Sequence, residues 1–104
     1  MDNRDYIIVL YDFYGELFNE RQRDYFEDYY FNNLSLAEIG DNFGVSRNAI
    51  HKVIQGVEEK LYFYEEKLGL YRKNKIICDI IEKEKDEELK KLLEGLVWGD
   101  EIYG

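Results

Sequence analysis

Five polar residues recur along one arc of a helix that the sequence predicts to begin near residue 47. Their side chains carry hydrogen-bond donors that suit phosphate oxygens or base edges. They are Arg47, Asn48, His51, Lys52 and Gln55. A recognition helix presents such a face to the major groove, so the segment predicts nucleic-acid binding. The alternative is an exposed helix whose polar face only meets water.

The elements that must position this face have the spacing of a helix-turn-helix over residues 36–55. Ser35 can cap a first helix, and Glu38 three residues later completes a capping box. Gly44 lies where the chain must turn, since glycine tolerates a positive φ, and Ser46 can cap the second helix. The residues expected to hold the unit together are Ser35, Ile39, Gly40, Phe43, Gly44, Val45, Ser46, Ile50 and Val53.

Apolar spacing predicts how these two helices pack. Ile39 and Phe43 are four residues apart and share a face, and Gly40 leaves room for the second helix to approach closely. Val45 is expected to fill the corner. The second helix should place one apolar arc in the core, made of Ile50, Val53, Ile54, Val57 and Leu61.

The stretch LSLAEIGDNFGVSRNAIHKVIQGVEEKL resembles region 4 of bacterial RNA polymerase sigma factors. That region has a Leu-x-Glu-Ile-Gly run followed by Gly-Val-Ser-Arg and a recognition helix. The flanking segments LFNERQRDYFEDYYFNNLSLAEIG and KLYFYEEKLGLY look closer still to the YlxM family of small bacterial helix-turn-helix proteins. The likeness covers roughly residues 4–75.

This resemblance implies a DNA-binding protein, without catalytic activity, that regulates or assists the signal recognition particle pathway of protein targeting. It also leaves an alternative. The chain could be an interaction module that binds the particle's RNA or its GTPase without reading DNA sequence. Sigma factors commonly carry more arginine on the recognition helix than the single Arg47 found here.

Net charge opposes nucleic-acid binding, because a chain of 104 residues with a charge of −9 is repelled by phosphates overall. Residues 35–75 form the least acidic region. A basic cluster there, Lys67, Arg72, Lys73 and Lys75, is expected to contact phosphates without reading sequence. A solvated helix end is the alternative. The acidic ends could keep DNA away or meet a basic partner.

Helical spacing throughout predicts an all-α fold, a small helical bundle that contains the helix-turn-helix and has a C-terminal helical tail. One helix should end at Gly15, and Asn19 should cap the next. The recognition helix should continue to about Lys67, before Gly69 breaks it. We expect one domain over residues 1–104, with a helical core at 4–68 and an extension at 70–98.

The extension carries an isoleucine stripe over residues 76–81, the charged stretch EKEKDEE, and a leucine-rich segment that Asp86 can cap and Gly99 can end. The pattern leaves open whether these are two helices or one. The stripe could pack on its own core or against a second molecule. Helix-turn-helix proteins often use dimers on two-fold sites, so a homodimer is an expected state.

Tyr62, Phe63 and Tyr64 follow one another and cannot all face one core, so at least one should be exposed. Near Lys67 and Arg72, an exposed ring could stack on an unpaired base. Packing against a neighbouring helix or a dimer partner is the more common use of such a ring.

Enzymatic chemistry, cofactors and metals are not expected. His51 is the only histidine and Cys78 the only cysteine, so neither has a partner for a metal site, and Cys78 is predicted to be buried or half-buried. No apolar run approaches the roughly 18 residues that cross a bilayer. The charged N-terminal segment MDNRDYIIVLYDFYG also lacks the apolar core of a signal peptide, so we expect a cytoplasmic protein.

Overall fold

The computed structural model describes residues 1–98, and this part of the chain is helical without strands. The helices are α1 (Asn3–Tyr14), α2 (Glu20–Tyr30), α3 (Leu36–Phe43), α4 (Arg47–Leu68), α5 (Leu70–Lys83) and α6 (Glu87–Trp98), with a 3-10 turn η1 (Gly15–Leu17) after α1. The all-α prediction is confirmed. No helix of the described residues is long and apolar enough to cross a membrane.

The chain divides into two compact units, Met1–Leu68 and the residues from Gly69 onward. Gly69 marks the division with φ 62°, the left-handed conformation that ends α4 where the sequence predicted. The single domain over the whole chain stays a prediction.

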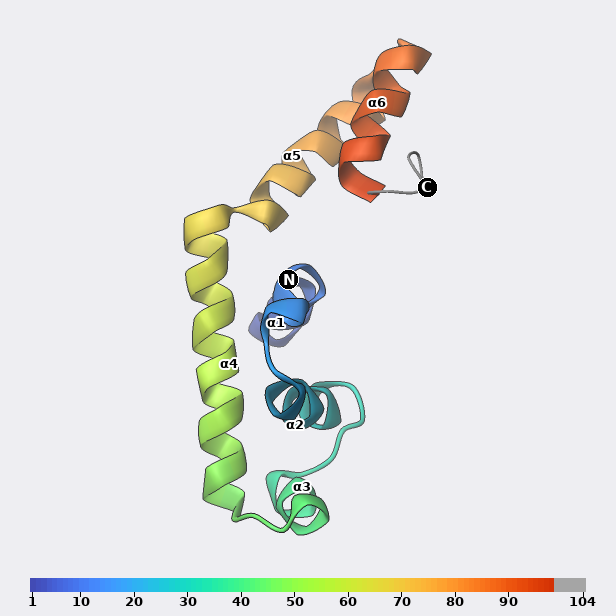
Figure 1. The fold of residues 1–104 in the computed structure, drawn as a ribbon. Helices are drawn as coiled ribbons and strands as arrows, with labels where there is room; N and C mark the ends of the chain where they lie inside the picture. The colour runs from blue at the N-terminus through green and yellow to red at the C-terminus, as the bar shows by residue number, and fades with distance from the viewer. Residues whose placement is uncertain (99–104) are drawn as a thin grey trace. The chain divides into compact units, whose positions relative to one another are not determined.

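In the first unit, α1, α2 and α3 each pack against α4 (Figure 1). The 22 residues of α4 make it long enough to support all three. The buried apolar residues form one core, made of Ile7, Leu10, Tyr11, Tyr14, Phe18, Tyr25, Phe26, Tyr30, Ile39, Ile50, Ile54, Val57 and Leu61.

Aromatic rings fill the centre of this core. The ring of Phe26 stacks between Tyr11, with centroids 4.1 Å apart, and Tyr30, with centroids 4.4 Å apart. Rings this close bury large areas and add a preference for offset stacking. A short chain can therefore bury more apolar area in its core with these aromatic residues than with aliphatic residues alone.

The second unit, over the described residues 69–98, consists of α5 packed against α6. Asp86 caps α6 by accepting hydrogen bonds from the backbone N–H groups of Glu88 and Leu89, as predicted. The sequence left one helix or two open, and the structure has two. The predicted stop at Gly99 lies outside the described residues.

Cys78 is half-buried, as predicted, and its thiol lies 3.7 Å from the side-chain oxygen of Asn74. In contrast with the first unit, no residue of α5 is buried, and in α6 only Gly95 is.

Candidate nucleic-acid interface

The turn between α3 and α4 has the geometry that its residue types predict. Ser35 and Glu38 form a reciprocal capping box at the start of α3, with distances of 2.9 and 3.1 Å. Gly44 ends α3 at φ 68° and ψ 32°. The Ser46 hydroxyl then accepts a hydrogen bond of 3.1 Å from the backbone N–H of Ala49 and caps α4.

Gly40 holds the turn against α3. A Cβ at this position would lie 2.7 Å from the carbonyl oxygen of Val45 and 3.4 Å from the backbone nitrogen of Arg47. The Val45 N–H also donates to the Gly40 carbonyl at 3.0 Å. The predicted close approach is therefore confirmed, and it brings the turn and the first residue of α4 against the glycine.

Three of the residues expected to hold the unit together are exposed or half-buried. Phe43 is 42% exposed, and its ring packs edge-to-face with Tyr25, with centroids 4.9 Å apart. Val45, expected to fill the corner, is 40% exposed, since the backbone of the turn occupies that space. Val53 lies at the border of the apolar arc and is half-buried, whereas Ile39 and Ile50 are fully buried.

All five predicted recognition residues are exposed on the first turns of α4: Arg47, Asn48, His51, Lys52 and Gln55. Within residues 1–98, their side chains form no hydrogen bond or ion pair with the protein. They therefore remain available to an external ligand. The structure holds them on one rigid helix that begins directly after the turn.

Two tyrosines of other helices hold carboxylates of α4 away from the exposed basic side chains of that helix. The buried Tyr14 hydroxyl donates to the Glu65 carboxylate at 2.6 Å, and the Tyr30 hydroxyl donates to Glu58. Two of the four carboxylates of α4 are therefore turned toward the core. Four basic residues of the first unit, by contrast, lie on exposed parts of the same helix: Arg47, Lys52, Lys60 and Lys67.

This segregation explains how an acidic chain can offer a positive surface. The remaining basic residues of the first unit lie on α1 and α2, where Arg4 donates to the Tyr30 carbonyl at 2.9 Å and Arg23 lies 3.8 Å from Glu27. The cations of α4 form no ion pair among the described residues. The net charge of the chain therefore does not predict the charge of the exposed face of α4.

The predicted basic cluster is split between the two units. Lys67 lies in the last turn of α4, whereas Arg72, Lys73 and Lys75 lie on α5, and all four are exposed. Lys60 was missed by the sequence analysis. Its signal was helical register, because it lies seven residues before Lys67 on the same helix.

Shifted pKa values mark the packing of the helices. Burial, strengthened by the hydrogen bond to Glu27, raises the pKa of Tyr11 to about 12. Burial and the Glu58 carboxylate also raise the pKa of Tyr30. Hydrogen bonds from Ser35 lower the pKa of the exposed Glu38 carboxyl, as expected for a helix cap.

The described residues contain no group of three or more histidine, cysteine or carboxylate side chains that could hold a metal ion. His51 is exposed on α4.

A capped short helix, a left-handed glycine turn and an exposed polar helix define a helix-turn-helix protein. The family profile for UPF0122, described as "Putative helix-turn-helix protein, YlxM / p13 like", matches residues 1–96. The chain belongs to this family, as its resemblance to YlxM proteins predicted. Membership of a helix-turn-helix family suggests nucleic-acid binding.

Relatives from several bacteria are similar along most of the chain. The UPF0122 protein of Caldanaerobacter subterraneus subsp. tengcongensis is 43% identical over 81 residues, which cover 78% of this chain and 69% of the relative. That of Thermoanaerobacter sp. strain X514 is 37% identical over 102 residues, covering 88% and 87%. That of Listeria innocua is 41% identical over 97 residues, covering 85% and 88%.

Proposed function

We propose that this chain is a non-catalytic, cytoplasmic regulatory protein that reads DNA by placing residues 47–55 of α4 in the major groove. The observation that carries the proposal is the exposure of all five polar side chains of this segment, without protein partners among the described residues. Helix-turn-helix proteins read base edges with the N-terminal residues of the second helix.

Each side chain suits a particular contact. Arg47 can bind guanine through two hydrogen bonds, and Asn48 or Gln55 can bind adenine in the same way. Lys52 suits a phosphate. Lys67, together with Arg72, Lys73 and Lys75 of α5, would add phosphate contacts that carry no sequence information.

The test is selection of duplexes from a randomised DNA pool at low and at moderate salt. Arg47→Ala and Gln55→Ala should each change the preferred sequence, by about 1 to 3 kcal/mol for each lost base contact. Lys73→Ala should weaken binding to every sequence alike. Arg21→Ala is a matched control, because Arg21 is an exposed arginine of α2. Absence of any enriched sequence, or equal losses in all variants, would refute sequence reading.

A second candidate function is an interaction module of the signal recognition particle pathway. An acidic hollow of about 280 Å³ on the first unit favours a basic partner such as the particle's GTPase or an RNA-bound protein. Its lining is Phe18, Glu20, Arg23, Asp24 and Glu27. Co-purification with particle components should survive Arg47→Ala and be lost in Glu20→Lys/Asp24→Lys. Direct binding of the particle's RNA would instead depend on the basic residues of α4.

The proposal includes a homodimer formed through α5 and α6. Large apolar side chains of these helices remain exposed, including Leu92 at 68% and Leu96 at 70%. Charges favour a second copy, because basic residues outnumber acidic ones on α5 and the reverse holds over residues 84–94. A two-fold interface needs such self-complementarity, with α5 of one copy against α6 of its partner.

A further inference from the structure

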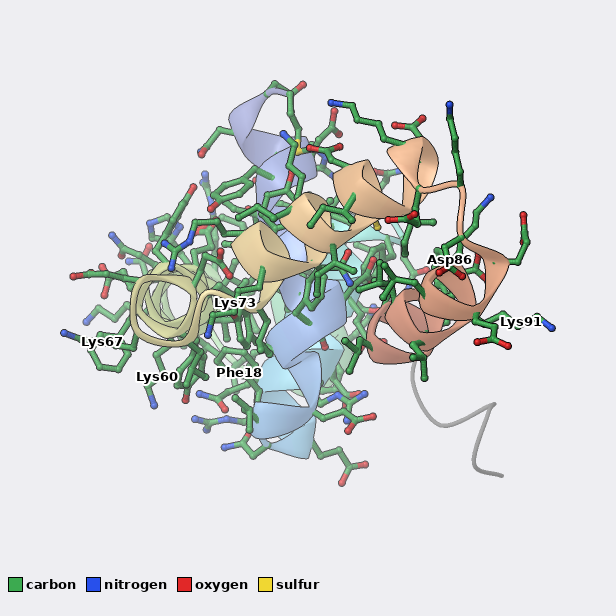
Figure 2. The ribbon with its side chains drawn as sticks, turned by 90° about the horizontal axis from the view of Figure 1, so that it is seen from above. Phe18, Lys60, Lys67, Lys73, Asp86 and Lys91 are labelled. Carbon is green, nitrogen blue, oxygen red and sulfur yellow. The ribbon has the colours of Figure 1, made fainter. Side chains whose placement is uncertain are left out.

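Three lysines lie on one exposed arc of α4 that extends beyond the proposed recognition residues. Lys52, Lys60 and Lys67 share this arc with Phe63, since steps of 100° per residue place all four within about 80°. The small residue Gly56 lies on this arc between Lys52 and Lys60. Figure 2, which looks along α4, shows Lys60 and Lys67 pointing to the same side of the helix, away from the other helices of the first unit.

Phe63 is the unusual member of this arc. Its side chain is 52% exposed, although the neighbouring Tyr64 is half-buried in contact with Tyr14 and Phe18. The Lys67 ammonium lies 5.8 Å from the centroid of the Phe63 ring, within cation–π range. An exposed ring flanked by two exposed lysines that form no ion pair among the described residues matches the combination with which proteins hold unpaired nucleotides, in which the base stacks and the phosphates meet cations.

Helix length separates this arc from the base-reading segment. At a rise of about 1.5 Å per residue, residues 47–55 span about 12 Å, close to the width of the major groove. By the same rise, Lys60 lies about 20 Å and Lys67 about 30 Å along the axis from Arg47. If residues 47–55 occupy a groove, Lys60, Phe63 and Lys67 therefore lie outside it.

The Phe63 ring and the charges beside it favour unpaired over duplex nucleic acid at this arc. Bases inside a duplex stack on one another and offer no free face to Phe63, whereas an unpaired base does. Glu59 and Glu66 are exposed along one border of the lysine arc. The positive strip is thus narrow and suits a single phosphate backbone better than the two backbones of a duplex.

We propose that Lys60, Phe63 and Lys67 form a second contact on α4, which binds unpaired nucleotides next to a duplex held by residues 47–55. Phe63 stacks on one base, and the two lysines neutralise the flanking phosphates. This inference rests on the proposed nucleic-acid function and deepens it, because it names the ligand as a junction between paired and unpaired nucleotides.

The experiment compares binding of the full chain to a short hairpin with a single-stranded tail, to the same hairpin without a tail, and to the tail alone. Fluorescence anisotropy at moderate salt gives the affinities, with DNA and RNA versions and tails at either end. The tail should tighten wild-type binding about tenfold, as one stacked base is worth roughly 1 to 3 kcal/mol. Phe63→Ala should remove this gain, and Phe63→Trp should retain it.

Two further measurements separate stacking from a change of fold. A 2-aminopurine placed in the tail should lose fluorescence on binding wild type and keep it with Phe63→Ala. Leu17→Ala is the matched control, because Leu17 is an exposed apolar residue of the same unit, on η1. It should leave the gain from the tail unchanged, and all variants should keep the wild-type circular dichroism.

The outcomes distinguish this inference from the proposed function. If the tail adds nothing, or Phe63→Ala keeps its full gain, the second contact is refuted, while loss of sequence preference in Arg47→Ala would still support DNA reading. If no hairpin sequence is preferred but the tail alone binds through Phe63, the DNA-reading proposal fails and the contact to unpaired nucleotides stands.

Discussion

The two units of this chain are built from similar helices but differ in where their apolar side chains go. In the first unit, α1 to α4 enclose a core that includes aromatic side chains such as Tyr14 and Phe26. In the second unit, no side chain of α5 is fully buried, and α6 leaves Leu92, Leu96 and Trp98 largely exposed. A helix pair alone has too little facing surface to enclose a core, so burial requires more helices.

This difference suggests separate roles for the two units: the first positions the recognition residues, and the second is suited to association with a partner. The first unit can hold the recognition residues of α4 at fixed positions, since α1, α2 and α3 all pack against that helix. Exposed apolar surface of the kind found in the second unit usually marks an interaction site. The two units also have separate optical probes, because the single tryptophan, Trp98, lies in the second unit and most tyrosines lie in the first.

The largest effect should come from emptying the aromatic core. Phe26→Ala removes a fully buried ring that stacks on Tyr11 and Tyr30, and should lower the free energy of unfolding of the first unit by about 3 to 5 kcal/mol. Leu92→Ala, at an exposed leucine of α6, should change it by less than about 0.5 kcal/mol. Urea titration followed by tyrosine circular dichroism measures both. Equal losses would show that the two units share one core.

The sequence predicted the parts of the fold that depend on local chemistry. The capping box of Ser35 and Glu38, the cap at Asn19, the turn at left-handed Gly44 and the helix break at Gly69 are confirmed, since each depends on a few neighbouring residues. The apolar arc of α4 was also predicted, apart from the half-buried Val53.

Predictions that depended on distant contacts were less complete. The burial of Val45 was wrong because the backbone of the turn occupies the corner next to Gly40. The pairing of Tyr14 with Glu65, 51 residues apart, leaves no local pattern in the sequence. It nevertheless affects the candidate site, because it turns a carboxylate away from the exposed face of α4. The roles of the nine proposed contact residues stay predictions.

A smaller effect should distinguish two glycines of the helix-turn-helix. Gly40→Ala would place a Cβ 2.7 Å from the Val45 carbonyl oxygen, so the turn must move, at a cost of about 1 to 3 kcal/mol. DNA affinity should fall with it, since the turn sets where α4 begins. Gly56→Ala is the matched control in α4, because a Cβ there meets nothing within 4 Å. It should stabilise the protein by about 0.5 to 1 kcal/mol through helix propensity.

Thermal unfolding and duplex binding of both glycine variants provide the check. An unchanged melting temperature in Gly40→Ala would mean that the turn has space that its geometry does not indicate.

Alkaline pH should weaken the first unit through its buried tyrosines. The pKa of Tyr11 is raised to about 12 in the folded state, from an ordinary value of 10.0, so the protonated phenol stabilises the fold. Because the folded pKa lies above the unfolded one, this contribution is complete below pH 10 and is lost as pH rises from about 10 to 12. Urea titrations across this window should give a shallower loss of stability in Tyr11→Phe than in wild type. A parallel fall in both proteins would argue against this role for Tyr11.

The smallest effect on the stability of the first unit should come from charges placed on α6, although they should change the association of the second unit most. Leu92→Glu/Leu96→Glu places charges on the exposed apolar stripe of α6, and should convert a dimer to a monomer while leaving the unfolding of residues 1–68 unchanged. Sedimentation over a range of concentrations gives the mass. The emission of Trp98, which is 68% exposed within one chain, should lie at shorter wavelength in wild type than in the variant if a second copy covers it. A wild-type protein that stays monomeric at high concentration would exclude the homodimer, and its exposed apolar stripe would then have to serve a different partner.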